Sequence, residues 1–146
     1  MKFGRYKPND DEVASKTIDG EAILINLSNG TYYSMDETAS VIWSMILLGY
    51  DFNEILNEVS EIYNVNADNI ITDIESLFEN LINEKIIFHS NDSKRSGHFN
   101  EIPKNLNYEK PILNIYRDMG DLLALDPPMP RVDDIPWKNN SKKKGN

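Results

Sequence analysis

The dipeptide Asn29–Gly30, which lies between two β-prone runs, is the feature of this sequence that most constrains its fold. Asn-Gly is the strongest short-range signal for a β-hairpin. The first run spans residues 22–27, and the second, which is rich in tyrosine, spans residues 31–35. Residues 13–18 alternate loosely between apolar and polar side chains and end at a turn signal. We therefore expect three antiparallel strands in succession.

A helix is expected directly after the second run. The carboxylate of Asp36 can cap the free N–H groups of a first helical turn, and Ser34 with Glu37 forms a competing capping-box pattern. Apolar residues then recur at helical spacing as far as Gly49, a residue type that commonly ends helices. The hairpin is thus predicted to lead straight into a helix.

Two further helices follow. Asp51 and Glu54 form a capping-box pattern before a single apolar stripe that ends at Tyr63. Asn66 is a good N-cap for a third helix, whose outer side carries Asp73, Glu75, Glu79 and Glu84. Residues 86–88 are expected to form a short strand or to close the core. The predicted fold is α+β and winged-helix-like, with a three-stranded antiparallel sheet followed by three helices.

The composition changes at the end of this region. A polar run punctuated by Gly and Pro begins at His89, and apolar character returns at Leu106. We therefore divide the chain into a domain over residues 1–90, a linker over 91–105 and an extended C-terminal tail over 106–146.

Composition also excludes several classes of protein. The sequence has no cysteine, which excludes disulfides and favours a reducing, cytoplasmic location. No apolar run approaches the roughly 20 residues that a membrane span needs. The first residues also lack the apolar stretch of a secretion signal. A cytoplasmic protein without membrane contact is expected.

The charge is unevenly distributed. The net charge is −9, and residues 1–92 hold five Lys/Arg against seventeen Asp/Glu (5 − 17 = −12). A winged-helix DNA-binding regulator is the alternative function, because such folds often place their last helix in the major groove. Residues 68–85, however, carry one lysine against five carboxylates (1 − 5 = −4), whereas a groove-reading helix needs cationic or amide side chains. No nucleic-acid partner is therefore expected.

An enzyme is not expected either. The two histidines, His89 and His98, both fall in the linker, and the glycines are scattered turn positions rather than a phosphate-binding loop. Most carboxylates fall on the solvent faces of the predicted helices. Nothing assembles a nucleophile, a base and an oxyanion site. We predict no catalytic residue, no metal site and no cofactor.

A third possibility is the capture of a peptide. An exposed strand edge presents unpaired N–H and C=O groups that an extended peptide can satisfy, while neighbouring pockets supply specificity. Residues 31–35 are the candidate edge, and the apolar side of the third helix is the candidate pocket. The alternative is that these side chains only form the core, which a domain this small also needs.

The residues themselves resemble a known family. The segments DGEAILINLSNGTYYSMDETASVIW, DFNEILNEVSEIYNV and IITDIESLFENLINEKII, together with the break at Gly49, resemble the PqqD family over residues 10–88. Its domains are also called RiPP recognition elements. The resemblance implies a non-catalytic domain that binds the leader of a ribosomally made peptide as an added strand and presents it to a peptide-modifying enzyme. Carried over by position, the peptide-binding residues are Thr31, Tyr32, Tyr33, Ser34, Met35, Ile70, Ile74, Leu77, Phe78 and Leu81.

The tail carries a second resemblance. Tyr108-x-x-Pro111-x-Leu113 is similar to the Tyr-x-x-Pro-x-Leu motif of lasso-type leader peptides, although Arg117 stands where those leaders usually have Gly and Met119 where they often have Phe. We hypothesise that this leader-like strand docks on the 31–35 edge, in cis or on a second molecule. A flexible linker of this length spans on the order of 20–25 Å, enough to reach back.

If the tail is a leader, the residues after it are candidates for the modified core peptide. Residues 122–137 would then be substrate, with possible modification sites at Asp126, Asp133, Asp134 and Trp137. The alternative is a fixed C-terminal extension in which residues 118–125 form a short helix packed on the domain. Oligomeric state, peptide identity and partner enzyme stay open at this point.

Overall fold

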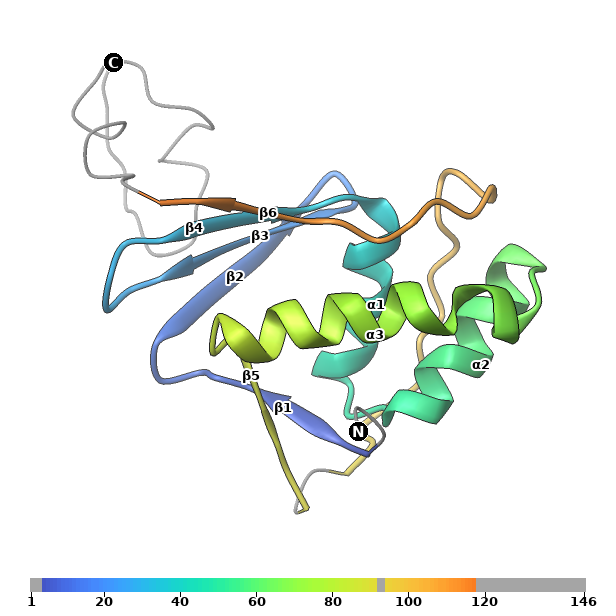
Figure 1. Cartoon of the computed structure of the whole chain (residues 1–146), viewed down its shortest axis with the longest axis horizontal. Helices are drawn as coiled ribbons and strands as arrows, with labels where there is room; N and C mark the ends of the chain where they lie inside the picture. The colour runs from blue at the N-terminus through green and yellow to red at the C-terminus, as the bar shows by residue number, and fades with distance from the viewer. Residues whose placement is uncertain (1–3, 92–93, 118–146) are drawn as a thin grey trace.

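A computed structural model describes residues 4–91 and 94–117 (Figure 1). The fold is α+β, with antiparallel sheets and three helices. In chain order the elements are β1 (Tyr6–Pro8), β2 (Val13–Ile18), β3 (Glu21–Asn26), β4 (Tyr32–Met35), α1 (Glu37–Leu47), α2 (Phe52–Tyr63), α3 (Ala67–Asn83), β5 (Ile87–His89) and β6 (Leu113–Tyr116).

The described residues form two sheets, one of four strands and one of two, so the prediction of a single three-stranded sheet was wrong. The first has the strand order β2-β3-β4-β6 and contains the three predicted strands plus β6 from the tail. The second pairs β1 with β5. Strand β1 was missed because it is only three residues long. Its Tyr6 is buried, with its ring 5.3 Å from that of Phe78, and this contact attaches β1 to α3.

The β3–β4 hairpin is present, but its connection is a five-residue loop over residues 27–31 rather than a two-residue turn. The side chain of Asn26 accepts hydrogen bonds from the backbone N–H groups of Ser28 and Asn29, at 2.8 and 3.2 Å. Gly30 supplies the positive φ of +77° that closes the loop. The Asn-Gly pair therefore predicted the hairpin correctly but not its turn type.

The predicted helix N-termini are confirmed. Asp36 caps α1 by accepting from the N–H of Ala39 at 2.9 Å, and Asn66 caps α3. Asp51 and Glu54 form a complete capping box on α2. Ser34 lies within β4, so the competing box with Glu37 does not form.

The predicted end of α1 at Gly49 is also confirmed. Gly49 has a φ of +87°, and its N–H donates to the carbonyl of Ile46 at 3.0 Å. The N–H of Tyr50 donates to the carbonyl of Met45 at 3.0 Å. These two bonds make a Schellman motif, which turns the chain sharply into α2.

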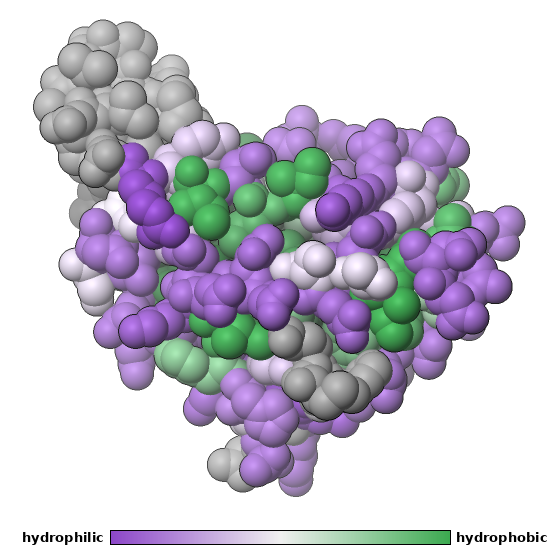
Figure 2. Space-filling model, viewed as in Figure 1, coloured by the Kyte–Doolittle hydropathy of each residue, from purple (hydrophilic) through white to green (hydrophobic). Residues whose placement is uncertain are grey.

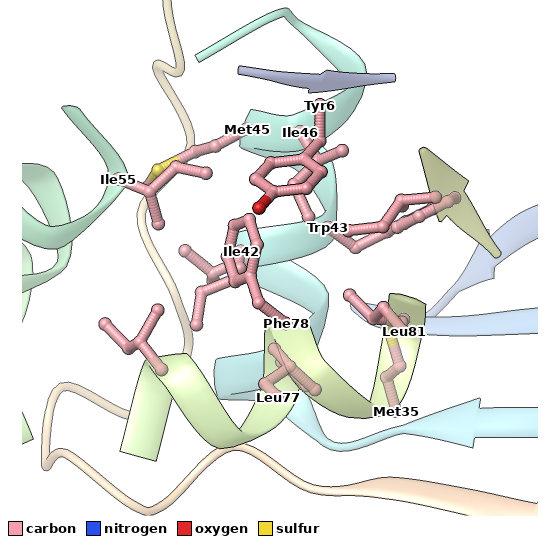
Figure 3. Close-up of a cluster of buried hydrophobic side chains, with 14 of the residues drawn as sticks. Tyr6, Met35, Ile42, Trp43, Met45, Ile46, Ile55, Leu77, Phe78 and Leu81 are labelled. Carbon is pink, nitrogen blue, oxygen red and sulfur yellow. The ribbon is translucent and has the colours of Figure 1, made fainter. Parts of the chain in front are cut away.

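The core lies between one face of the four-stranded sheet and the three helices. Strand β3 turns Ala22, Leu24 and Asn26 towards it, while Ile23 and Ile25 face the other side of the sheet. Figure 3 shows side chains from β1, β4 and all three helices meeting in one cluster. Its largest fully buried members include Trp43, Tyr33, Phe52 and Phe78.

Two features of the described residues bear on function. No helix among them is long and apolar enough to cross a membrane. No group of three or more histidine and carboxylate side chains within the same ranges is arranged to hold a metal ion.

Candidate functional site

The edge of β4 pairs with the tail of the same chain. Strand β6 runs antiparallel to β4, with Tyr32 opposite Tyr116 and Met35 opposite Leu113 (Figure 1). Two further hydrogen bonds continue this pairing to the start of α1. The N–H of Asp36 donates to the carbonyl of Ile112 at 3.4 Å, and the N–H of Ile112 donates to Asp36 Oδ1 at 3.2 Å.

Asp36 therefore connects the helix cap to the tail, because the same carboxylate oxygen caps α1 and accepts from Ile112. Burial of this carboxyl group raises its pKa above the ordinary aspartate value, and the two N–H donors offset part of that rise. A paired strand edge and a helix N-terminus thus meet at one acidic residue.

Only three side chains between residues 106 and 117 are withdrawn from solvent. Pro111 is buried, Tyr108 and Leu113 are half-buried, and the other residues of this range are exposed. These three are the positions of the Tyr-x-x-Pro-x-Leu pattern. On the face shown in Figure 2, apolar patches lie along the course of β6 within a mostly hydrophilic surface.

Tyr108 contacts two helices. Its hydroxyl donates to Asp73 Oδ2 of α3 at 2.9 Å, and its ring lies edge-to-face with that of Tyr63 of α2 at 5.8 Å. Burial raises the pKa of the Tyr108 phenol well above its usual range, and the bond to Asp73 adds to the rise. The neutral phenol is therefore the form that fits this position.

The strand alternation of β6 gives its two faces different surroundings. Leu113 stands opposite Met35 and packs against the core cluster beside α3. On the other face Asn114 Nδ2 donates to Ser34 Oγ at 3.3 Å. The ring of Tyr116 lies 5.9 Å from that of Tyr32 on this same face.

A charged contact follows β6. Arg117 Nη2 lies 2.6 Å from Glu84 Oε2, at the end of α3, and Glu84 Oε1 accepts from the hydroxyl of Tyr33 at 3.0 Å. Burial and the bond to Glu84 raise the pKa of Tyr33 to about 12. Pairing with Glu84 raises the pKa of Arg117 above its ordinary value.

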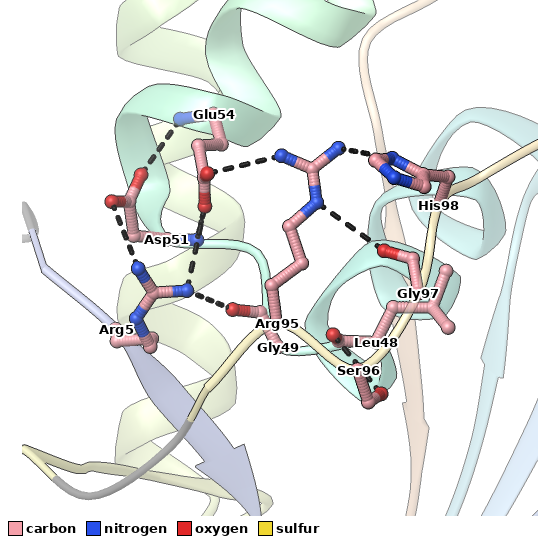
Figure 4. A network of polar contacts seen from close by, with 9 residues as sticks. All are labelled: Arg5, Leu48, Gly49, Asp51, Glu54, Arg95, Ser96, Gly97 and His98. Atoms are coloured by element: carbon pink, nitrogen blue, oxygen red, sulfur yellow. Dashed lines mark hydrogen bonds and ion pairs between the residues drawn. The ribbon is translucent and has the colours of Figure 1, made fainter.

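Residues 94–105, here called the strap, lie against the domain rather than forming a free tether (Figure 4). Arg95 lies over the ring of Tyr50, 3.9 Å from its centroid, and pairs with Glu54 at 3.1 Å. The N–H of Ser96 donates to the carbonyl of Leu48 at 2.7 Å. The assumption of a flexible linker therefore does not hold over these residues.

The end of the strap is fixed at the N-terminus of α1. The two carboxylate oxygens of Glu37 accept from the N–H groups of Lys104 and Asn105, at 2.7 and 3.1 Å. Only residues 106 and 107 separate this contact from Tyr108. The strap therefore leads directly to the surface of α2, α3 and β4 that the tail contacts, here called the docking surface.

The residues predicted to bind a peptide lie in or next to the docking surface, and most of them are buried beneath it. Thr31 and Tyr32 are buried beside the outer sheet face, and Ser34 is half-buried and bonded to Asn114. The others are buried in the core cluster against which Tyr108 and Leu113 pack: Tyr33, Met35, Ile70, Ile74, Leu77, Phe78 and Leu81. Which of them contact a bound peptide stays a prediction.

Sequence reasoning missed four residues that contact the tail. Asp73 and Glu84 were assigned to the solvent side of the third helix, and they accept bonds from Tyr108 and Arg117 instead. Asp36 was identified only as a cap, and Tyr63 only as part of an apolar stripe. The predicted modification sites Asp126, Asp133, Asp134 and Trp137 lie outside the described residues, as does the alternative short helix over 118–125.

Comparisons with known proteins agree with this architecture. The family model described as coenzyme PQQ synthesis protein D (PqqD) matches residues 21–87. A solved structure described as TbiB1 in complex with the TbiA(beta) leader peptide matches with a TM-score of 0.54 and 30% identity. That match covers 59% of this chain and 99% of the other. No curated protein sequence matches the chain.

The family match ends at residue 87, so the strap and β6 lie beyond it. The elements inside it are the whole β3–β4 hairpin, the three helices and the first residue of β5, so the match contains every element of the docking surface. On the strength of both matches, the chain belongs to the PqqD family.

Proposed function

We propose that this chain is a non-catalytic recognition element for leader peptides, with the β4 edge and the docking surface beside α3 as its binding site. We further propose that residues 108–117 are a leader-type ligand fused to the domain and docked in cis. A solved relative at 30% identity is described in complex with a leader peptide, which supports this assignment. The implied partner is an enzyme that modifies the attached or a separate peptide.

One observation carries the proposal. From residue 106 to residue 117, the side chains withdrawn from solvent are Tyr108, Pro111 and Leu113. Tyr108 and Pro111 precede β6, so pairing with the β4 edge alone does not account for their withdrawal from solvent. Here the spacing is three and then two, with a proline that favours an extended chain before it. This is the spacing of the leader motif that the tail resembles.

The proposal extends to the residues that follow. A leader is joined to the peptide that is modified, so residues 122–137 are the proposed substrate, with Asp126, Asp133, Asp134 and Trp137 as the candidate positions. Mass spectrometry of the full chain, co-expressed with peptide-modifying enzymes from its source, tests this part. A mass shift confined to residues 122–137 supports the fused substrate, and an unmodified tail argues for a fixed extension.

DNA binding is not favoured by the charges of the site. Helix α3 has no lysine or arginine, and it carries Asp68, Asp73, Glu75 and Glu79. Such a helix repels phosphates. Binding to duplex DNA at low salt would overturn the peptide assignment in favour of a regulator.

The direct test separates ligand from domain. A chain ending at residue 105 is titrated with a synthetic peptide of residues 106–117, and binding is measured by calorimetry. The informative peptide variant is Leu113→Ala, which removes a half-buried anchor. Its matched control is Ile112→Ala, which removes an aliphatic side chain that is 48% exposed.

Leu113→Ala should weaken binding about 5- to 30-fold, corresponding to about 1–2 kcal/mol for a partly buried leucine. Ile112→Ala should change the affinity less than twofold. Circular dichroism of the shortened chain verifies that it is folded before titration. No binding by a folded domain at millimolar peptide, or equal losses for both variants, would refute the cis-ligand proposal.

A further inference from the structure

The carboxylate at the end of α3 is placed where helix electrostatics disfavour it. Glu84 is the C-cap residue of a 17-residue helix, and the last turn of that helix contains no basic residue. The C-terminal end of a helix carries partial negative charge, so an anionic side chain there is destabilising unless it has a cationic partner. The position of Glu84 therefore calls for a partner from elsewhere in the chain.

That partner comes from the tail. Arg117 Nη2 lies 2.6 Å from Glu84 Oε2, while the other carboxylate oxygen is bonded to Tyr33. The Glu84 side chain is only 15% exposed, whereas that of Arg117 is 57% exposed. Charge-assisted bonds of this length are stronger than neutral ones, and partial burial of the acceptor limits screening by solvent.

The register of the added strand determines which tail residue reaches Glu84. Leu113 and Ile115 stand opposite Met35 and Tyr33, two members of the core cluster beside α3. Side chains alternate along an extended chain, so the residue four positions after Leu113 returns to this face about 13 Å further on. A shift by one residue would turn that side chain away.

We propose that Glu84 is a specificity-determining residue of the site, and that it selects peptides with a cationic side chain four residues after the leucine anchor. This inference rests on the proposed function, because it assumes that residues 108–117 occupy the peptide site. It defines the class of ligand more narrowly: an extended segment with Tyr, Pro and Leu anchors followed by Arg or Lys. Tyr33 orients the Glu84 carboxylate and couples it to β4.

The test uses the full chain and measures hydrogen exchange over residues 109–116. Arg117→Gln and Glu84→Gln each remove the ion pair, and Gln at position 84 keeps an acceptor for the Tyr33 hydroxyl. The charge-exchange variant combines Glu84→Arg with Arg117→Glu. The matched control is Lys104→Gln, which breaks a cation–carboxylate pair with Asp19 outside the docking surface.

Each single variant should increase the exchange rate of β6 amides roughly three- to tenfold, the range expected for a partly buried ion pair. In a double variant that carries Arg117→Gln and Glu84→Gln, β6 amides should exchange no faster than in either single variant. The charge-exchange variant should restore at least part of the wild-type protection of these amides. Lys104→Gln should leave the exchange of β6 unchanged.

A Leu113→Ala variant of the full chain distinguishes a failure of the Glu84 selectivity from a failure of tail docking. If it speeds β6 exchange while Arg117→Gln does not, the selectivity assigned to Glu84 is refuted and the docking of the tail stands. If neither variant changes β6 exchange, the anchors themselves do not hold the tail, and the proposed function fails. Additive effects of Arg117→Gln and Glu84→Gln would also overturn the inference, because partners in one contact cannot add.

Discussion

The hydroxyl of Tyr108 offers a sharp test of how the tail is held. Tyr108→Phe keeps the ring against Tyr63 and removes the 2.9 Å hydrogen bond to Asp73. A hydrogen bond from a phenol to a carboxylate contributes about 1–2 kcal/mol when the pair is partly exposed. The equilibrium constant for opening of β6 from the β4 edge should therefore rise about 5- to 30-fold, since 1.4 kcal/mol corresponds to a factor of ten.

Tyr108→Ala should have a larger effect. It also removes the edge-to-face ring contact, which contributes about 0.5–1.5 kcal/mol beyond the buried area. The assay is hydrogen exchange of residues 109–116 in the full chain, with exchange of α3 as the internal reference. The matched control is Tyr116→Phe, because no hydrogen bond of the Tyr116 hydroxyl is found among the described residues, and β6 exchange should stay within twofold of wild type.

A double-mutant cycle with Asp73→Asn isolates the pairwise contribution. If Tyr108→Phe weakens docking equally in the wild-type and Asp73→Asn backgrounds, the hydroxyl does not act through Asp73. If Tyr108→Phe and Tyr108→Ala both leave β6 exchange unchanged, Tyr108 is not an anchor at all. Either result would refute the mechanism by which we connect the tail to α3.

Two further predictions concern the same region. Because the pKa of Tyr108 is raised, its neutral form favours docking; this contribution is complete below the ordinary tyrosine pKa of about 10 and is lost as pH rises through the raised value. In a titration of tyrosinate absorbance, Tyr108→Phe should remove one phenol from the late part of the curve, and a loss from the early part would contradict the assignment. Gly49→Ala should lower the free energy of unfolding by about 2–4 kcal/mol, because a Cβ at a φ of +87° would also meet the carbonyl oxygen of Lys94, only 2.3 Å away. Gly30→Ala is the matched control: its φ is +77° but nothing lies within 4 Å of the added Cβ, so a loss of only about 1 kcal/mol is expected. Equal losses in chemical denaturation would show that the strap does not pack against Gly49.

Local signals predicted the framework of the domain well. The caps at Asp36, Asp51 and Asn66 act within one helical turn, and Gly49 ends α1 through bonds inside the same segment. Such interactions join residues that are close in sequence, so sequence patterns are sufficient to predict them. The hairpin was predicted for the same reason, although its loop is longer than the Asn-Gly signal suggests.

Long-range contacts were harder to predict. Strand β1 is three residues long and exists because Tyr6 reaches Phe78, a contact that no local pattern encodes. Asp73 and Glu84 looked solvent-facing because helical periodicity separates apolar from polar faces. That periodicity does not reveal that another segment covers part of the polar face. The resemblance to a known family predicted which strand edge and which helix would receive a peptide, and this stays a prediction. The acidic residues that contact the tail became apparent only in the structure.

The strap has a consequence for how the β4 edge behaves on dilution. Glu37 fixes the chain at Asn105, three residues before Tyr108, so β6 meets its edge at an effective concentration on the order of millimolar or higher. A separate peptide dissociates from its site when its concentration falls below its Kd, but a strand on the same polypeptide stays at its effective concentration on dilution. The stoichiometry of strand to edge is one to one in every molecule, at any expression level. A competing peptide with the same intrinsic affinity as β6 must therefore exceed that internal concentration before it can displace β6.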